Sequence, residues 1–197
     1  MKLIIFDFDG VLVDTLSICF AIHKEVDKDM LLEEYQAMFK GNIHEMINSS
    51  KRSHIPDYFE QYNNKTRELT IPLELKKIIQ DIFPKHTLAI VSSTPTSSIR
   101  TILDREGVSA CFTDILGNDV HKSKVVKIKM LLEKHKVSPN DAVFITDTVG
   151  DILEGRVCGV KSIAVTWGFH EEKTLQKSKP TKMVSTPEDL LKAIQEI

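Results

Sequence analysis

Short apolar runs rich in β-branched residues recur along most of the chain, each about as long as one strand. The runs are "KLIIF", "TLAIVS", "FTDIL", "AVFIT", "SIAVT" and "KMVS". From the second run onward, segments with helical periodicity separate them: "SSIRTILDREG", "KVVKIKMLLEKHK", "GDILEGRVCG" and "PEDLLKAIQEI". Apolar strands that alternate with amphipathic helices are typical of βαβ units. The pattern therefore predicts an α/β fold with a doubly wound parallel sheet covered by helices on both faces.

Residues 15–82 interrupt this alternation because they contain no strand-like run. Four of their segments have the pattern of short helices: "LSICFAIHKEVDK", "MLLEEYQAMFKG", "NIHEMINSSK" and "PDYFEQYNNKTREL". An insertion of this length exceeds a simple crossover, so we expect a core of residues 1–14 and 83–197 and a small all-helical cap of residues 15–82. Because ligands of open α/β sheets bind at the carboxyl ends of the strands, the cap would cover a site there.

Composition and charge exclude several classes of protein. The 197 residues are 42% hydrophobic and 27% charged, as in a globular domain that buries a core without disulfides. The net charge is −2, so no overall positive field directs the chain to nucleic acid or to an anionic membrane. Three cysteines without metal-ligand spacing favour free thiols. No run resembles a signal peptide or a membrane span, so we expect a cytoplasmic protein of unspecified oligomeric state.

Polar side chains follow three of the predicted strands, and two lysines precede a predicted helix. They are Asp7 and Asp9, Ser92 and Ser93, Asp147 and Asp151, and the lysines Lys122 and Lys124. Parallel strands end at one edge of their sheet, so these groups are expected to converge. Like charges at the two neighbouring aspartates repel unless a cation offsets them. Oxygen ligands of this kind favour Mg²⁺, which keeps several waters and pairs with phosphate.

Each of these groups also has a purely structural alternative. The first two aspartates could cap a turn, and the serines could form a hydroxyl turn before Pro95. Asp147 and Asp151 could stabilise a helix N-terminus. The lysines belong to a basic stretch of the kind found on solvated helix faces, without the aromatic residues expected of a nucleic-acid site. These groups favour a functional site only in combination, and none of them does so alone.

Read in order, these segments resemble the haloacid dehalogenase-like (HAD) superfamily. "DFDGVLVDT" is similar to its first motif, "IVSS" to its second, and "TDTVGD" to its fourth. Relatives of the phosphoglycolate phosphatase and β-phosphoglucomutase type usually read KPxP at the third motif, whereas this chain reads "KSKV". The number of residues between the lysine and Asp147 favours Lys122 as the third-motif lysine, with Lys124 as the alternative. An aspartate at position 9 points to phosphatase or phosphomutase chemistry within the superfamily.

The resemblance implies a role for each matched residue. Asp7 would be the nucleophile that forms an aspartyl phosphate, and Asp9 would exchange protons with the leaving group and with water. Asp7, Asp147 and the Asp9 backbone carbonyl would bind Mg²⁺. Ser92 would bind the phosphoryl oxygens, and Lys122 would neutralise charge on them. Asp151 would lie behind the metal and hold one of its waters or the lysine.

Further contacts to the substrate are expected from Gly10 and Ser93, and from the predicted cap. The segment "FKGNIHEM" resembles the substrate-facing loop of related caps, so Lys40 and His44 are candidates for contact with the part of the substrate beyond the phosphate. Polar surface residues around a helix break would look the same. The insertion is also shorter than in typical phosphoglycolate phosphatases.

The predicted function is therefore hydrolysis of a small phosphorylated metabolite with Mg²⁺, phosphoglycolate being the named candidate by family analogy. A sugar phosphomutase would use the same aspartyl phosphate but return the phosphoryl group to a sugar. A binding protein that keeps the fold without catalysis is the third hypothesis, and it rests on the altered third motif.

Overall fold

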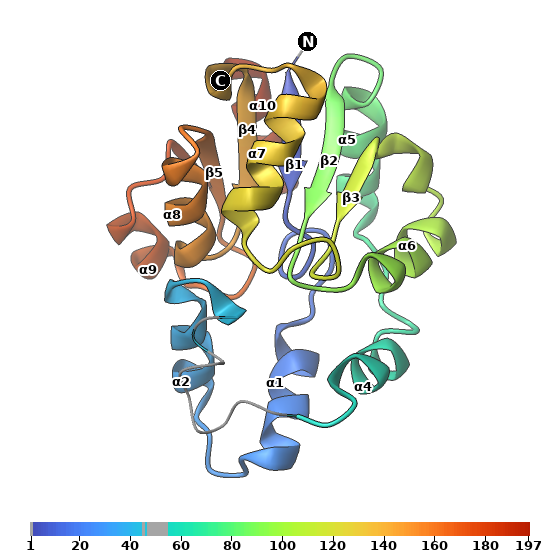
Figure 1. Cartoon of the computed structure of the whole chain (residues 1–197), viewed down its shortest axis with the longest axis vertical. Helices are drawn as coiled ribbons and strands as arrows, with labels where there is room; N and C mark the ends of the chain where they lie inside the picture. The colour runs from blue at the N-terminus through green and yellow to red at the C-terminus, as the bar shows by residue number, and fades with distance from the viewer. Residues whose placement is uncertain (1, 45, 47–54) are drawn as a thin grey trace.

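A six-stranded, fully parallel sheet forms the centre of the molecule in a computed structural model that describes residues 2–44, 46 and 55–197 (Figure 1). The strands are β1 (Leu3–Phe6), β2 (Thr87–Val91), β3 (Asp114–Leu116), β4 (Ala142–Thr146), β5 (Lys161–Val165) and β6 (Lys182–Val184). Their order is β3-β2-β1-β4-β5-β6, so β1 lies between the strands that precede Ser92 and Asp147. Each strand coincides with a predicted run, and the α/β prediction is confirmed.

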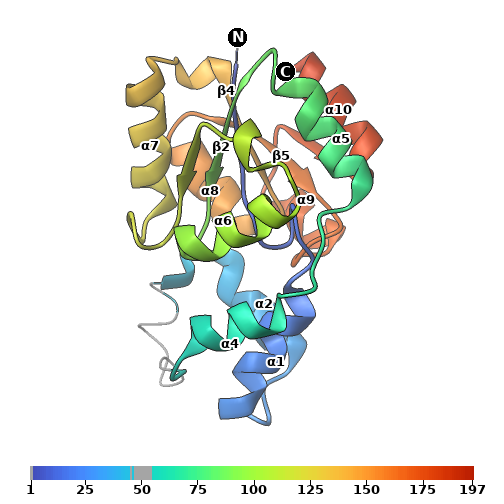
Figure 2. The same ribbon diagram turned by 90° about the vertical axis from the view of Figure 1, so that its right-hand side faces the viewer.

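Helices cover both faces of this sheet (Figure 2). They are α5 (Leu73–Ile82), α6 (Thr96–Arg105), α7 (Lys124–His135), α8 (Val149–Val157), α9 (Glu172–Lys177) and α10 (Pro187–Glu196), with short 3-10 turns η2 (Ser109–Cys111) and η3 (Pro139–Asp141). Alternate residues of β1 point to opposite faces, as the pleat of a strand requires. Ile4 and Phe6 pack in the cluster with α5, α6 and α10, whereas Leu3 and Ile5 pack with α7.

The remaining helices lie together beyond the carboxyl ends of the strands (Figure 1). They are α1 (Leu16–Val26), α2 (Leu32–Ala37), the 3-10 turn η1 (Met38–Lys40) and α4 (Tyr58–Lys65). We call these elements the cap helices. Their buried side chains form a separate cluster that includes Ile22, Tyr35 and Tyr62 and that contacts the sheet domain through Phe169. Most of the predicted helix "NIHEMINSSK" falls outside the described residues.

Helix α5 lies with the sheet and not with the cap helices, although we placed residues 15–82 in the cap. Its buried residues Leu75, Ile78, Ile79 and Ile82 recur at helical spacing and join the same cluster as β1 and α10. Figure 2 shows α5 and α10 side by side. The apolar stripe of α5 needs the sheet to cover it, so the chain returns to the core before residue 73.

None of the helices in the described ranges has both the length and the apolar character that crossing a membrane requires.

Candidate active site

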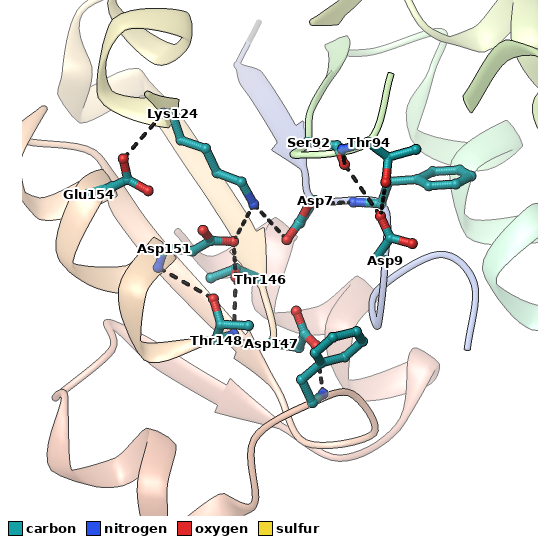
Figure 3. A network of polar contacts seen from close by, with 12 residues as sticks. Asp7, Asp9, Ser92, Thr94, Lys124, Thr146, Asp147, Thr148, Asp151 and Glu154 are labelled. Carbon is teal, nitrogen blue, oxygen red and sulfur yellow. Dashed lines mark hydrogen bonds and ion pairs between the residues drawn. The ribbon is translucent and has the colours of Figure 1, made fainter. Parts of the chain in front are cut away.

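Asp7 lies at the carboxyl end of β1 and forms an ion pair with Lys124 (Figure 3). Its backbone N–H donates to the Ile145 carbonyl of β4 at 2.9 Å, which continues the ladder one residue past the strand. Its Oδ2 accepts a hydrogen bond from Lys124 Nζ at 2.8 Å, and its Oδ1 accepts one from the Phe8 N–H at 2.7 Å. Lys124 Nζ also donates to Asp151 Oδ2 at 2.7 Å. One buried ammonium thus joins two carboxylates from different strand ends.

The geometry favours Lys124 as the third-motif lysine, whereas the sequence spacing favoured Lys122. Ser123 caps the N-terminus of α7, accepting from the Val126 N–H at 3.4 Å, so Lys124 is the first residue of the helix and is 5% exposed. Lys122 lies before the cap, is exposed, and reaches only the wall of the cavity described below. The position of the helix start, which sequence spacing did not reveal, decides which lysine is buried.

Asp147 follows β4 and is completely buried beside the turn that follows β1. Its Oδ2 accepts from the Phe169 N–H at 2.6 Å, and its Oδ1 has no hydrogen-bond partner among the described residues. A Cβ built on Gly10, whose φ is +75°, would lie 2.0 Å from Asp147 Oδ2. Glycine is therefore required here both by its backbone conformation and by the close approach of the carboxylate. Gly10 supports Asp147 and is not among the described residues that line the cavity.

Burial of these carboxylates leaves negative charge that Lys124 alone does not offset. Burial, together with the charge of Asp151, raises the pKa of Asp147 to about 7. Burial also raises the pKa of Asp7 well above its ordinary value, against the opposing effect of Lys124. Burial alone would raise the pKa of Asp151 too, but Lys124 and the Thr146 hydroxyl lower it. Three carboxylates share one lysine, so a divalent cation would balance the charge.

The donor set fits such a cation. The unpartnered Asp147 Oδ1 is a hard oxygen in a buried position, and Asp7 contributes a second carboxylate. No cluster of three or more His, Cys, Asp or Glu side chains with metal-binding geometry occurs in the described ranges. The expected set needs only two carboxylates, because its third protein ligand is the backbone carbonyl of Asp9 and Mg²⁺ retains waters.

Asp9 is held by hydroxyl groups from three different parts of the chain. Its Oδ1 accepts from Thr15 Oγ1 at 2.9 Å and from the Tyr62 hydroxyl at 2.7 Å, and its Oδ2 accepts from Thr94 Oγ1 at 2.7 Å. The Ser92 hydroxyl is more distant, at 3.5 Å. Sequence reasoning missed all three close donors. Two of them lie within or beside the quoted motif segments, whereas nothing in the sequence indicated Tyr62, which comes from cap helix α4.

Ser92 lies at the end of β2 and is fully buried. Its Oγ accepts from the Thr94 N–H at 3.0 Å, which fixes the turn after the strand. Its carbonyl accepts from Lys127 Nζ at 2.5 Å, and the same nitrogen lies 3.3 Å from the Gly117 carbonyl. Lys127 was not singled out in the sequence, although it lies one helical turn after Lys124 and is completely buried.

A cavity of about 410 Å³ opens between these residues and the cap helices. Its described lining includes the predicted residues Asp7, Asp9, Ser92, Ser93, Lys122, Asp151 and His44, together with Lys124. Lys40 is exposed and is not among the described lining residues, so the structure does not bring it to the site. His44 lines the cavity, and its Nε2 is buried without a hydrogen-bond partner in the described part of the chain.

The cap helices and the segment just after η1 contact the sheet domain directly around this cavity. Gln36 Nε2 donates to the Phe169 carbonyl at 2.5 Å, and Asn42 Nδ2 donates to Glu154 Oε1 at 2.9 Å. Glu154 Oε1 also accepts from the backbone N–H of Lys124 at 3.2 Å. Glu154 thus links Asn42, beside the cap helices, to the first residue of α7, which is Lys124.

Comparison with known proteins shows which chains this one is similar to. The chain is 25% identical to a phosphoglycolate phosphatase of Vibrio parahaemolyticus, over 98% of this chain and 96% of the relative. It is 24% identical to a phosphoglycolate phosphatase of Synechococcus elongatus, over 100% and 99% of the two chains. A hydrolase from Pseudomonas syringae has the same fold with a TM-score of 0.81, at 16% identity, over 100% of this chain and 99% of that one.

A haloacid dehalogenase-like family protein from Streptococcus pneumoniae also shares the fold, with a TM-score of 0.77 and 22% identity over 99% of both chains. The family model for haloacid dehalogenase-like hydrolases matches residues 4–165, which include every strand-end residue described above. The chain belongs to the haloacid dehalogenase-like hydrolases.

Proposed function

We propose that this protein is a Mg²⁺-dependent phosphatase that hydrolyses a small phosphorylated metabolite through an aspartyl phosphate on Asp7. The observation that carries the proposal is the arrangement around Lys124. Its ammonium holds the Asp7 carboxylate at the floor of a cavity, 2.8 Å away, with Asp9 on the same floor. Phosphatases among the curated relatives support the reaction class, and phosphoglycolate is the substrate that their names suggest.

The residues of this chain divide the reaction into two displacements. A carboxylate oxygen of Asp7 attacks phosphorus while the bond to the leaving oxygen breaks, and Asp9 supplies a proton to that oxygen. Water then attacks the aspartyl phosphate, Asp9 removes its proton, and the Asp7 carboxylate is regenerated with release of phosphate. Lys124 and the backbone and hydroxyl donors near Ser92 stabilise the phosphoryl charge.

The carboxylates of Asp7 and Asp147 and the Asp9 carbonyl would hold Mg²⁺. When bound, the ion supplies positive charge that keeps the nucleophile ionised and stabilises the phosphoryl oxygens. Asp151, which pairs with Lys124 and accepts from Thr146 Oγ1 at 2.7 Å, keeps the lysine aligned.

Replacement of Asp7 provides the test. Asp7→Asn should reduce Mg²⁺-dependent phosphate release from a panel of phosphomonoesters by roughly a thousandfold or more, because the nucleophile is lost. Asp14→Asn is the matched control, since Asp14 follows the same strand but is exposed and outside the cavity lining. Acid-quenched wild-type enzyme should yield a phosphorylated peptide that contains residue 7.

Three results would contradict the proposal. Normal turnover by Asp7→Asn would remove the nucleophile assignment. Isomerisation of a sugar phosphate without free phosphate would identify a phosphomutase. Absence of Mg²⁺-dependent turnover across the whole panel would favour a binding protein.

A further inference from the structure

The cavity has two chemically different halves. The sheet domain contributes the polar floor, where Lys124 and the carboxylates and hydroxyls around it lie (Figure 3). The opposite half is mostly aromatic and aliphatic, with residues such as Tyr35, Phe39, Tyr58, Phe59 and Phe169. The polar side chains of His23, Asn42 and His44 also line it. A phosphate bound near Asp7 would therefore direct the rest of its molecule toward this second half.

The size of the cavity exceeds the need of a two-carbon acid. Its volume of about 410 Å³ falls within the roughly 300–1,000 Å³ of pockets that enclose drug-sized ligands. A substrate that filled only the floor would leave the apolar wall in contact with water. Burial of a larger apolar group removes that contact, and this burial is the main source of affinity such a wall can offer.

Among the described lining residues that the cap helices and their connecting segments contribute, none is a lysine or arginine that could pair with a substrate carboxylate. Lys124 is already shared by Asp7 and Asp151, and Lys122 belongs to the loop before α7 in the sheet domain. Burial and nearby lysines, Lys122 first among them, lower the pKa of His44 to about 4, and burial also lowers the pKa of His23. Both imidazoles are neutral at physiological pH.

Aromatic rings in this half are arranged so that another ring can join them. Phe39 packs edge-to-face against Phe169 with centroids 4.8 Å apart, and Tyr58 packs the same way against Phe59 at 5.1 Å. Phe39, Tyr58 and Phe59 are only partly buried, so each retains ring surface that faces the cavity or solvent. Edge-to-face contact with a further ring would add to the affinity gained from area alone.

We propose that the substrate is a phosphomonoester whose alcohol carries an aromatic or similarly bulky apolar group, which lies against Phe39, Tyr58 and Phe59. This specificity rests on the proposed phosphatase function and refines the phosphoglycolate candidate. A carboxylate placed against these three rings would lose its hydration, and none of the three residues could offer it a cationic partner.

Turnover of benzyl phosphate and of phosphoglycolate tests the specificity. Both are phosphate esters of alcohols, so their leaving groups are of the same type. Benzyl phosphate should have a kcat/KM at least about tenfold above that of phosphoglycolate, because only the benzyl group buries apolar surface on the cap side. A preference for phosphoglycolate, with phosphate released efficiently, would overturn the specificity and leave the phosphatase function intact.

Variants locate the effect within the cavity. Phe59→Ala should raise the KM for benzyl phosphate by about tenfold more than it changes the KM for methyl phosphate, because only the benzyl group reaches the ring. Phe83→Ala is the matched control, since Phe83 is 44% exposed on the sheet domain and is not part of the described lining. Phe59→Leu keeps most of the side-chain volume and separates loss of the ring from loss of cap packing. Equal losses on both substrates would overturn the assignment.

Binding of non-hydrolysable analogues separates the two proposals. Calorimetry of the full chain with Mg²⁺ should show benzylphosphonate binding at least about tenfold more tightly than phosphonoacetate. If benzylphosphonate binds in this way but no phosphomonoester is hydrolysed, the proposed phosphatase function fails. The proposal that Phe39, Tyr58 and Phe59 bind an apolar group is then still supported. Equal or tighter binding of phosphonoacetate overturns the assignment of the wall.

Discussion

Lys122 and Lys124 are only two positions apart in the chain, but one is exposed and the other is buried. Lys124 is buried and pairs with Asp7 and Asp151, and these carboxylates raise its pKa although burial alone would lower it. Lys122 is exposed at the wall of the cavity. A buried charge that bridges Asp7, the proposed nucleophile, and Asp151 is expected to matter far more than one that faces solvent.

We therefore expect Lys124→Met and Lys122→Met to differ strongly. Lys124→Met should lower kcat for methyl phosphate by roughly a hundredfold or more, because the transition-state charge loses its fixed cation. Lys122→Met should change it by less than about threefold. Steady-state kinetics measure both, and circular dichroism checks that Lys124→Met still folds. A larger loss in Lys122→Met would show that the third-motif lysine is Lys122 after all.

The sequence predicted the carboxylates of the site better than their hydrogen-bond donors. Asp7, Asp9 and Asp147 follow apolar strands directly, so strand recognition alone placed them at one edge of the sheet. Whether the donors to Asp9 reach it depends on turn and helix geometry. Tyr62 in particular is more than fifty positions away in the chain, and no local pattern indicates its contact with Asp9.

At the scale of elements, α7 joins the second and third strands through one buried amine. Lys127 Nζ lies against the carbonyls of Ser92 after β2 and Gly117 after β3. Burial and the charge of Lys124 lower the pKa of Lys127 to about 7. A neutral amine still has two N–H groups, so it can donate to both carbonyls without the cost of a buried charge.

Lys127 should give stability a distinctive pH dependence. Its pKa in the folded state lies below that of the unfolded chain, so the unfolded chain binds more protons between these values and stability rises with pH. The stability of wild type relative to Lys127→Met should therefore increase between about pH 7 and pH 10. Urea denaturation across this range measures it. Lys129→Met, an exposed position in the same helix, should show the same change of unfolding free energy with pH as wild type. A stability difference between wild type and Lys127→Met that does not change with pH would contradict the prediction.

Elements with strong patterns were predicted correctly, and those whose position depends on tertiary packing were not. The six strands and helices α6, α7, α8 and α10 coincide with the apolar runs and periodic segments of the sequence. Helix α9 has six residues and a single buried side chain, so it leaves almost no periodic signal. The sequence alone could not assign α5 to the sheet domain, because its apolar stripe would suit either partner.

At the scale of the whole molecule, the cap helices contribute a hydrogen bond to the proposed catalytic centre as well as covering it. The Tyr62 hydroxyl of α4 donates to Asp9 Oδ1, so the Asp9 carboxylate, the proposed proton-transfer group, has all its hydrogen bonds only when the cap helices lie against the sheet domain. Closure would then exclude bulk water and complete the hydrogen bonds around Asp9 in one step.

Removal of this hydroxyl should slow catalysis without weakening binding. Tyr62→Phe keeps the ring packing, so we expect kcat to fall by about tenfold with little change in KM. Asn64→Ala, an exposed position in the same helix, should behave as wild type. Kinetics with benzyl phosphate and with methyl phosphate measure the effect, which should be similar for both. An unchanged kcat, or a loss confined to KM, would show that Tyr62 does not position Asp9.

The central place of β1 has a consequence for the order in which the chain acquires its structure during synthesis. Leu3 pairs with Thr87 on one side and with Ala142 on the other, so β1 leaves the ribosome well before either of its partner strands. Until the region of residue 142 has emerged, one edge of this fully apolar strand has no ladder to join, and such edges favour aggregation. Chains truncated before β4 are therefore expected to depend on chaperones, whereas the cap helices can already form contacts among themselves.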